Sequence, residues 1–314
     1  MIIIDSLEEL SYYIKSGTAI ALGNFDGLHR AHMKIIQAAV DYAKAHKIKS
    51  VIYMFREHPS NFIEGCIEVK YITPNLYKEE ILKATDVDIL FYDSFPQMEK
   101  KSPEEFLDYL SHDFKVKFIS AGFNFTFGYH ASGSEAYLRS RCAELGIETD
   151  IIQREAYHGE VISSSRIREL IREGNVFLAS RFLGRPYFVL GVVEHGRKLG
   201  TNLTFPTINS HVNEIALLPK NGVYITRTFI DGVLHKSITN IGIKPTIGGE
   251  DLTVETYIID YKGDLYGRNI KIDFLDRIRD ERKFDSLEAL KEQISRDVKT
   301  AAEYEHDQAA ENLM

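Results

Sequence analysis

Short apolar runs alternate with helical patterns over the first half of the chain. Between about Thr18 and Ile152, runs rich in isoleucine, valine and alanine precede stretches in which apolar residues recur every three to four positions. Ser102 followed by Pro103 marks one helix start. The pattern predicts strands at 18–23, 49–55, 87–92, 116–122 and 147–153, with helices at 30–46, 75–85, 102–114 and 134–146. Such alternation is typical of an α/β domain with a parallel sheet, whose site lies beyond the carboxyl ends of the strands.

The pattern changes in the second half of the chain. Residues 163–184 predict a helix that ends at Gly174 and a second helix after it. From Pro186 the chain is β-rich, and glycine-containing turn signals separate its runs, at 186–196, 222–230, 234–243, 253–261 and 269–278. This spacing predicts a compact antiparallel β-barrel, followed by an amphipathic helix at 285–304. We expect two domains, 1–183 and 184–314.

Length and composition agree with two globular domains and exclude several classes of protein. The chain has 314 residues, 44% of them hydrophobic, and a formal net charge of −8. That charge argues against a general nucleic-acid binder but allows a positive pocket for a small anion. No apolar run approaches the roughly 20 residues that span a bilayer, and the acids after the three N-terminal isoleucines do not fit a signal peptide.

Cysteine usage points to the compartment. Cys66 and Cys142 lie far apart and outside any CxxC pattern, which favours a reducing, cytoplasmic setting. We therefore expect a cytoplasmic protein with small-molecule substrates and with neither nucleic acid nor membrane as a partner. No sequence pattern sets its oligomeric state.

The segment GNFDGLHRAHMKII, from Gly23, contains the first candidate site. His29 and His32 share one face at a predicted helix N-terminus, where free N–H groups and the helix dipole favour an anion. Gly23 and Gly27 allow the backbone to approach a nucleotide closely. The segment lacks the P-loop pattern, so it predicts phosphate recognition of another kind, suited to displacement at phosphorus. Two alternatives are a zinc site, which needs a third ligand such as His58, and incidental surface histidines.

A second basic segment, SSSRIREL, begins at Ser163. One of its serines is suited to cap the helix, and this structural role alone can explain a serine at that position. Arg166 lies in the first turn, where its guanidinium can bind a polyphosphate.

The barrel region contains another candidate site. Gly196 and Gly200 lie in a predicted loop that can close over phosphates and donate hydrogen bonds from its backbone N–H groups. Thr207 and Asn209 are two residues apart, so their oxygens face the same way in an extended segment and suit Mg²⁺ held with nucleotide phosphates. Glu255 interrupts an apolar strand, as expected of a general base or of the exposed side of an edge strand.

The first motif set resembles the flavin-handling branch of the HxGH-type nucleotidyltransferase family. The matching segments are GNFDGLHRAH, SSSRIREL, AGFNFTFGYHASGS and the HPS turn. The resemblance implies that His29, His32 and Arg166 bind ATP phosphates. It implies further ATP contacts at Gly23, Asn24, Phe25, Gly27 and Ser164, and flavin contacts at His58, Asn124 and Phe125. Ala31 stands where the motif has glycine, and its methyl group crowds the nucleotide at a cost of about 1–3 kcal/mol where the site does not relax.

The second motif set resembles the riboflavin kinase family, through Pro206–Asn209, Glu255 and the segment FLDRIRDERKFDSLEALKEQI. The resemblance implies that Thr207 and Asn209 hold ATP-bound Mg²⁺ and that Glu255 activates the terminal ribityl hydroxyl. It also implies ATP contacts at Gly196, Gly200 and Thr207, and a flavin contact at Arg279. Thr201 and Thr204 stand where that family has arginine and glycine.

Both motif sets, in this order, resemble the prokaryotic bifunctional riboflavin kinase/FMN adenylyltransferase family. The implied fold is an N-terminal parallel-sheet nucleotidyltransferase domain followed by a C-terminal antiparallel β-barrel kinase domain with a terminal helix. The implied activity converts riboflavin and ATP to FMN, then FMN and a second ATP to FAD and pyrophosphate, with Mg²⁺. Two alternatives are a single-activity adenylyltransferase whose kinase half is impaired and a flavin-binding regulator.

Overall fold

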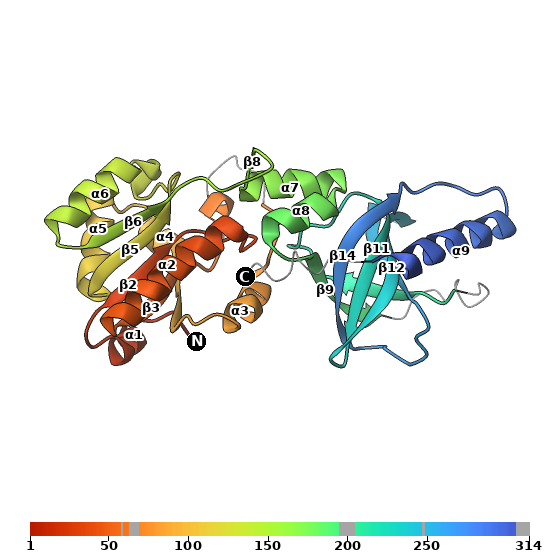
Figure 1. Cartoon of the computed structure of the whole chain (residues 1–314), viewed down its shortest axis with the longest axis horizontal. Helices are drawn as coiled ribbons and strands as arrows, with labels where there is room; N and C mark the ends of the chain where they lie inside the picture. The colour runs from red at the N-terminus through yellow and green to blue at the C-terminus, as the bar shows by residue number, and fades with distance from the viewer. Residues whose placement is uncertain (58, 63–68, 195–204, 247–248, 306–314) are drawn as a thin grey trace. The chain divides into compact units, whose positions relative to one another are not determined.

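The structure is a computed structural model that describes the chain except residues 58, 63–68, 195–204, 247–248 and 306–314 (Figure 1). Contacts within the chain divide it into two compact units, Met1–Ser163 and Ser164–Met314.

A six-stranded parallel sheet forms the centre of the first unit, within the described residues. Its order is β1-β4-β3-β2-β5-β6, with bounds β1 (Ile2–Ile4), β2 (Thr18–Leu22), β3 (Lys49–Phe55), β4 (Ile89–Asp93), β5 (Val116–Gly122) and β6 (Glu148–Ile152). The chain runs from β2 to β3 and β4 on one side, and β5 then returns to the other side of β2. The strand order therefore reverses between β2 and β5, which is where open α/β sheets bind ligands.

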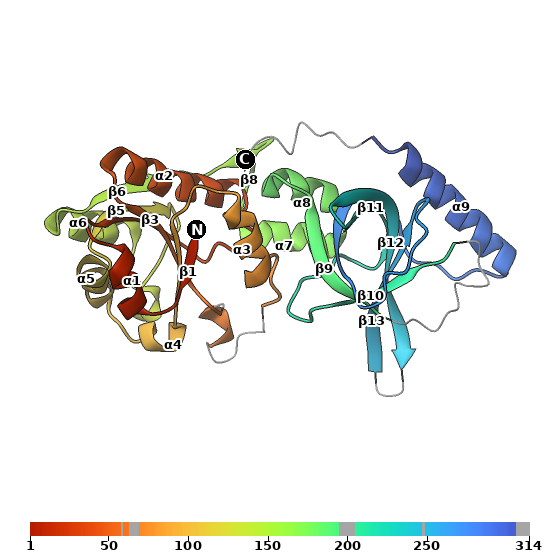
Figure 2. The ribbon, with the colours of Figure 1, turned by 90° about the horizontal axis from the view of Figure 1, so that it is seen from below.

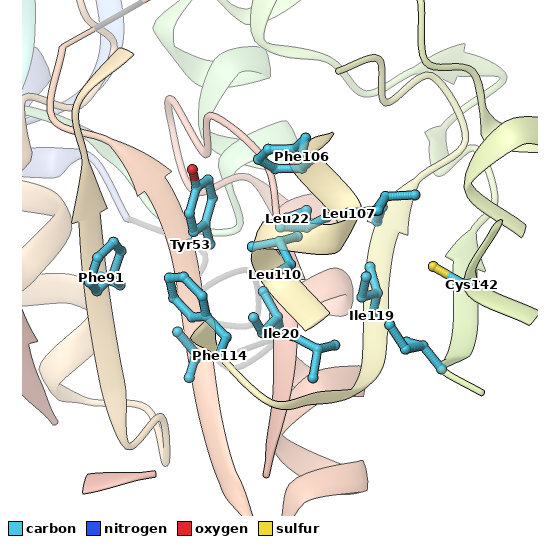
Figure 3. Close-up of a cluster of buried hydrophobic side chains, with 14 of the residues drawn as sticks. Ile20, Leu22, Tyr53, Phe91, Phe106, Leu107, Leu110, Phe114, Ile119 and Cys142 are labelled. Atoms are coloured by element: carbon cyan, nitrogen blue, oxygen red, sulfur yellow. The ribbon is translucent and has the colours of Figure 1, made fainter. Parts of the chain in front are cut away.

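Helices cover both faces of this sheet (Figure 1). The helices are α1 (Leu7–Tyr13), α2 (Arg30–His46), α3 (Asn75–Lys83), α4 (Phe95–Met98), α5 (Pro103–Asp113) and α6 (Glu135–Glu144). α2 and α3 pack on one face, and α1, α5 and α6 pack on the other. Figure 3 shows part of the core between the sheet and α1, α5 and α6, in which Phe106 and Leu110 of α5 lie over Leu22 and Tyr53 of the sheet.

The predicted elements of this unit are confirmed with small shifts in their bounds. α2 and β3 have the predicted limits, and α5 begins after Ser102, whose side chain forms a capping box with Glu105. The sequence did not predict β1, α1, α4 or the small hairpin of β7 (Ala156–Tyr157) and β8 (Glu160–Val161). β1 is three residues long and gains its structure by pairing with β4, which its local sequence does not signal.

The second unit is built around a closed antiparallel barrel, as predicted (Figure 2). Its order is β10-β13-β12-β11-β14-β9, with bounds β9 (Tyr187–Glu194), β10 (Ile208–Val212), β11 (Gly222–Ile230), β12 (Val233–Thr246), β13 (Gly249–Ile258) and β14 (Asn269–Arg279). The helices of this unit are α7 (Ser164–Glu173), α8 (Val176–Leu183) and α9 (Leu287–Glu303). Gly174, between α7 and α8, has φ +84° and lies against Arg277 and Tyr224 of the barrel, so a side chain there would be strained and would collide.

The interior of the barrel contains a chain of hydroxyl groups. Buried hydroxyls on β11, β12 and β13 bond to one another at 2.8–2.9 Å; they belong to Thr226, Thr228, Ser237, Thr239 and Thr256. Alternate residues face outward, where Ile225, Ile238 and Leu275 pack against Ala301 of α9. Glu255 alternates with Thr256, so it belongs to this outer face.

Across the described ranges, no helix is both long enough and apolar enough to cross a membrane.

Candidate active sites

The two predicted histidines form a stacked pair at the start of α2. His29 is the N-cap of the helix, and its Nδ1 accepts a hydrogen bond from the backbone N–H of His32 at 3.3 Å. The rings stack with centroids 3.5 Å apart, and His29 is only 4% exposed. Because Nδ1 of His29 accepts, the proton of the neutral ring lies on Nε2, which is then a hydrogen-bond donor. The pair thus combines helix capping with the donor chemistry that an anion needs.

The loop before His29 has an unusual backbone that closes over one ring. Phe25 and Leu28 have φ of +48° and +40°, and Gly27 has φ +92°. Phe25 is fully buried, and its ring meets the edge of His32 with centroids 5.3 Å apart. A Cβ on Gly23 would lie 3.1 Å from that ring, so the glycine lets Phe25 fold back against the end of β2. Asn24 is exposed at the turn.

Two buried charged residues anchor this loop to the segment that begins α3. The carboxylate oxygens of Asp26 accept from the backbone N–H groups of Ile72 and Thr73 at 3.1 and 3.0 Å. The ammonium of Lys78, in α3, donates to the carbonyl oxygen of Asn24 at 3.3 Å. Neither residue was predicted from the sequence. Lys78 is four residues before the buried Leu82, so its place on the apolar face of a predicted helix was the available signal.

The permanent cations of α2 are already paired within the unit. Arg30 and Lys34 lie 3.3 and 3.0 Å from the carboxylate of Glu155, which is nearly buried after β6. This pairing offsets one of the two positive charges in the first turns of α2.

The loop after β5 begins at the sheet edge beside the histidine loop, because β2 and β5 are paired up to Leu22 and Ala121. Asn124 is exposed in this loop, with its Oδ1 over Gly122. Phe125 is half-buried and stacks on Phe127, with ring centroids 5.6 Å apart. Phe127 belongs to the core. The structure therefore brings Asn124 and Phe125 to the same edge as His29 and His32 while assigning Phe127 to packing.

A buried carboxylate orders the ends of β3 and β4 at the same edge. Asp93 accepts hydrogen bonds from the hydroxyls of Tyr53 at 2.6 Å and Tyr109 at 2.9 Å. Burial, followed by the negative charge of Asp93, raises the pKa of both tyrosines, so they remain protonated donors. The predicted flavin contact His58 follows β3 in the sequence but lies outside the described residues.

Ser164 and Arg166 belong to the second compact unit. Ser164 is the first residue of α7, and Arg166 lies in its first turn, as predicted. The guanidinium of Arg166 approaches Glu169 at 3.2 Å and Glu173 at 3.7 Å. Its action together with the histidine pair stays a prediction.

The barrel aligns the predicted kinase residues by strand register. Asn209 on β10 pairs with Glu255 on β13, and Glu255 pairs on its other side with Asn240 on β12. Side chains directly opposite each other share a face and have Cβ atoms about 4.5–5.5 Å apart. Asn209, Glu255 and Asn240 therefore form one row on the outer face, here called the reaction row. Asn240 was not predicted, because the cross-strand register cannot be derived from the sequence of one segment.

The residues before β10 approach this face through an aromatic contact. Phe205 meets Tyr257 of β13 edge to face, with centroids 5.3 Å apart, and Thr207 is exposed just before the strand. The predicted phosphate-loop glycines Gly196 and Gly200 lie outside the described residues. Thr201 and Thr204 do so as well.

The segment between β14 and α9 also reaches the reaction row. Nδ2 of Asn240 donates to Oε1 of Glu281 at 3.0 Å, and a Cβ on Gly242 would collide with the same carboxylate. Arg279 does not point freely toward a ligand: its Nε and Nη2 donate to the buried Asp297 of α9 at 3.0 and 2.8 Å. Its predicted contact with the flavin stays a prediction, and its visible role is to hold α9 on the barrel.

The donor sets distinguish the two sites in their suitability for metals. Among the residues that the structure describes, no cluster of three or more His, Cys, Asp or Glu side chains could hold a metal ion. Nδ1 of His29 is moreover committed to the helix cap, which disfavours the zinc interpretation of His29 and His32. Thr207 and Asn209 offer neutral oxygens beside Glu255, a set that fits Mg²⁺ shared with phosphate oxygens.

The fold and the two sites are those of a two-domain enzyme that binds nucleotides and flavins. Comparisons with known proteins identify the family. A FAD synthetase family model matches residues 12–166 and a riboflavin kinase family model matches residues 183–305. The chain belongs to the family of bifunctional riboflavin kinase/FMN adenylyltransferases. The predicted domain boundary at 183/184 stays a prediction, since neither model covers residues 167–182 and contacts divide the chain at 163/164.

Individual relatives cover almost the whole chain. The bifunctional riboflavin kinase/FMN adenylyltransferase of Bacillus subtilis is 33% identical, over 91% of this chain and 92% of the relative. That of Listeria monocytogenes is 34% identical, over 88% and 89%. A Streptococcus pneumoniae crystal structure described as a macrolide-efflux protein is 29% identical, with a TM-score of 0.88 over 97% of this chain and 99% of that one. The predicted family and fold class are thereby confirmed.

Proposed function

We propose that this chain phosphorylates riboflavin to FMN with one ATP and adenylylates FMN to FAD with a second ATP, releasing pyrophosphate. One observation carries the proposal. A single polypeptide presents a histidine-capped helix N-terminus at the switch point of a parallel sheet, and an Asn–Glu pair on the outer face of a barrel. The first suits anion positioning and the second suits transfer to a neutral hydroxyl.

In adenylyl transfer, a phosphate oxygen of FMN attacks the α-phosphorus of ATP, and the bond to the pyrophosphate oxygen breaks. The nucleophile is already an anion, so the site needs positioning and charge stabilisation rather than a strong base. We assign phosphate binding to His29 and His32, with Gly23, Asn24, Phe25 and Gly27 shaping the ATP site. Asn124, Phe125 and His58 are the proposed flavin residues, and Arg166 and Ser164 the proposed further ATP contacts.

In riboflavin phosphorylation, the terminal ribityl oxygen attacks the γ-phosphorus of ATP, and the bond to the β-phosphate oxygen breaks. Glu255 accepts the hydroxyl proton, which a neutral nucleophile must lose. Asn209, opposite Glu255, and Thr207 would hold Mg²⁺, which neutralises phosphate charge when bound. Gly196 and Gly200 are proposed to contact the ATP phosphates, and Arg279 to border the flavin.

A product assay tests the proposal. The purified chain is given Mg-ATP with riboflavin alone or with FMN alone, and flavin products are separated by chromatography. The proposal expects FMN and FAD from riboflavin and FAD from FMN. FAD from FMN without FMN from riboflavin would establish the single-activity adenylyltransferase, and tight flavin binding with no product would establish the regulator.

We further propose a cytoplasmic location and a boundary between the catalytic halves near residues 183/184. The small-molecule partners are riboflavin, FMN and ATP. Expression of 1–183 and 184–314 as separate chains tests the boundary, which requires FMN adenylylation from the first chain and riboflavin phosphorylation from the second.

A further inference from the structure

Lys78 is buried to a degree that a surface helix does not explain. It is 2% exposed, although lysine is almost never fully buried without a specific partner. Its ammonium donates to the carbonyl of Asn24 at 3.3 Å and lies 5.6 Å from the centroid of the Tyr71 ring. Tyr71 is itself buried, so the charge lies in an enclosed setting in which electrostatic interactions are strong.

Asp26 makes the reciprocal connection. It is also 2% exposed, and it accepts the backbone N–H groups of Ile72 and Thr73, just before α3 begins. The carboxylate of the loop therefore bonds to the segment that begins α3, and the ammonium of α3 bonds to the loop. These two opposite connections, here called the loop clamp, fix the loop on both sides of Phe25.

The loop clamp acts on the part of the loop whose backbone conformation is the most strained. Phe25 and Leu28 adopt positive φ, which a non-glycine residue maintains only when its surroundings enforce it. Phe25 packs on His32, and His29 and His32 are stacked and share a hydrogen bond. A displacement of the loop at Asn24 is therefore transmitted to both imidazoles through contacts that are already in place.

We propose that Lys78, acting with Asp26, is a positioning residue for adenylyl transfer: it sets the loop that presents His29 and His32 to the ATP phosphates. The inference deepens the proposed adenylyl transfer and rests on it. Lys78 acts through the carbonyl of Asn24 rather than by contact with substrate. Its positive charge also favours binding of the anionic ligand, because a charge in an enclosed region is only weakly screened by salt.

A purely structural role makes a different prediction. Replacing a buried charge by an apolar group of similar volume is often neutral or stabilising. Lys78→Met keeps most of the side-chain volume and removes the donor and the charge. If Lys78 served only stability, the apparent kcat of FMN adenylylation would fall in proportion to the folded fraction of the first unit, while the KM for ATP would stay at the wild-type value.

The experiment measures both activities and the melting temperature of the full chain for Lys78→Met, Lys78→Arg and Lys83→Met. Lys83 is on the same helix but exposed, so Lys83→Met is the matched control. For Lys78→Met we expect the KM for ATP in FMN adenylylation to rise about tenfold, equivalent to ~1.4 kcal/mol, with a smaller change in kcat. Riboflavin phosphorylation by Lys78→Met should stay at the wild-type value, and so should both activities of Lys83→Met. Lys78→Arg should recover part of the lost ATP affinity, because it restores a cation.

Asp26→Asn gives an independent measurement, because it keeps the volume and one acceptor while removing one of the two anchoring hydrogen bonds. It should raise the same KM, and it decides the question if Lys78→Met does not fold. Unchanged adenylylation in folded Lys78→Met, a parallel loss of both activities, or an unchanged KM for ATP in Asp26→Asn would overturn the clamp. A wild-type chain that makes no FAD from FMN would instead refute the proposed function.

Discussion

The two candidate sites obtain their geometry in different ways. At the histidine site, the loop between a parallel strand and a helix is anchored by two buried charges, Asp26 in the loop and Lys78 in α3. At the barrel, strand pairing aligns Asn209 with Glu255 and then with Asn240. A loop can be displaced as a unit, whereas a strand register is fixed by the whole ladder. Changes remote from chemistry should therefore matter more at the first site than at the second.

The sites also differ in the charge that they bring to a phosphate. The first offers a helix N-terminus, imidazole donors and a buried ammonium. The reaction row offers two amides and a carboxylate, which by themselves do not attract phosphate. In the proposed mechanism, Mg²⁺ would therefore supply the positive charge at the barrel half, while the carboxylate of Glu255 accepts the hydroxyl proton.

Glu255→Gln should give the largest effect and separate the two halves most cleanly. The amide retains the shape of the carboxylate but cannot accept the hydroxyl proton, so riboflavin phosphorylation should fall by about 10²–10⁴-fold. FMN adenylylation should be unchanged. Steady-state rates with each flavin measure both, and Glu288→Gln, an exposed residue of α9, is the control. Retention of more than a tenth of the kinase rate would remove Glu255 from the role of base.

His32→Ala should produce the converse result with a somewhat smaller effect. Loss of one phosphate donor should lower the rate of FMN adenylylation by about 10²-fold, as for a single group that stabilises developing charge. His46→Ala is the matched control, since His46 is exposed at the opposite end of the same helix. Riboflavin phosphorylation reports that the chain is folded. A kinase loss of the same size would mean that His32 acts on the fold instead.

Local sequence patterns predicted most of the fold, because most elements carry their own signals. The capping box at Ser102 and the apolar stripe of α2 are such signals. β10 was treated only as an extended segment, because its sequence INSHV has little apolar periodicity and pairing with β9 and β13 makes it a strand.

The sequence predicted that candidate residues lie together where the motif is continuous, and it did not predict partners that only the fold supplies; the binding roles of the candidate residues stay predictions. The histidine pair lies on one helix turn, so spacing was sufficient. Asp26, Lys78, Glu155 and Asn240 act across long sequence separations, and one sequence gives no measure of such contacts. The guanidinium of Arg279 likewise has a buried carboxylate partner that a motif does not reveal, and its contact with the flavin stays a prediction.

Asn240→Asp should test the register-based site at moderate strength. The new carboxylate would face Glu281 across the position of the present 3.0 Å hydrogen bond, and the like charges would displace the segment that begins at Arg279. If that segment borders the flavin, the KM for riboflavin should rise about tenfold, or ~1.4 kcal/mol. Glu281→Gln alone keeps an acceptor for Asn240 and should have a small effect.

The double variant Asn240→Asp with Glu281→Gln reverses the donor and the acceptor. Because the glutamine amide can donate to the new carboxylate, the KM should return close to that of Glu281→Gln. A double variant as impaired as Asn240→Asp would show that the contact between residues 240 and 281 does not set riboflavin affinity.

The smallest expected effect is a gain, and it comes from Ala31→Gly at the histidine site. Ala31 lies between the two histidines in the first turn of α2 and is half-buried, so its methyl group borders the space next to the imidazoles. Removing one crowding methyl group should raise kcat/KM for ATP in FMN adenylylation about fivefold, or ~1 kcal/mol. Glycine in a helix costs up to about 1 kcal/mol relative to alanine, so the melting temperature should fall by roughly 2–4 °C. Activity and stability should thus change in opposite directions, while Ala38→Gly on the same helix should lower stability without the gain. Equal or lower adenylylation by Ala31→Gly would show that the site already accommodates the methyl group of Ala31.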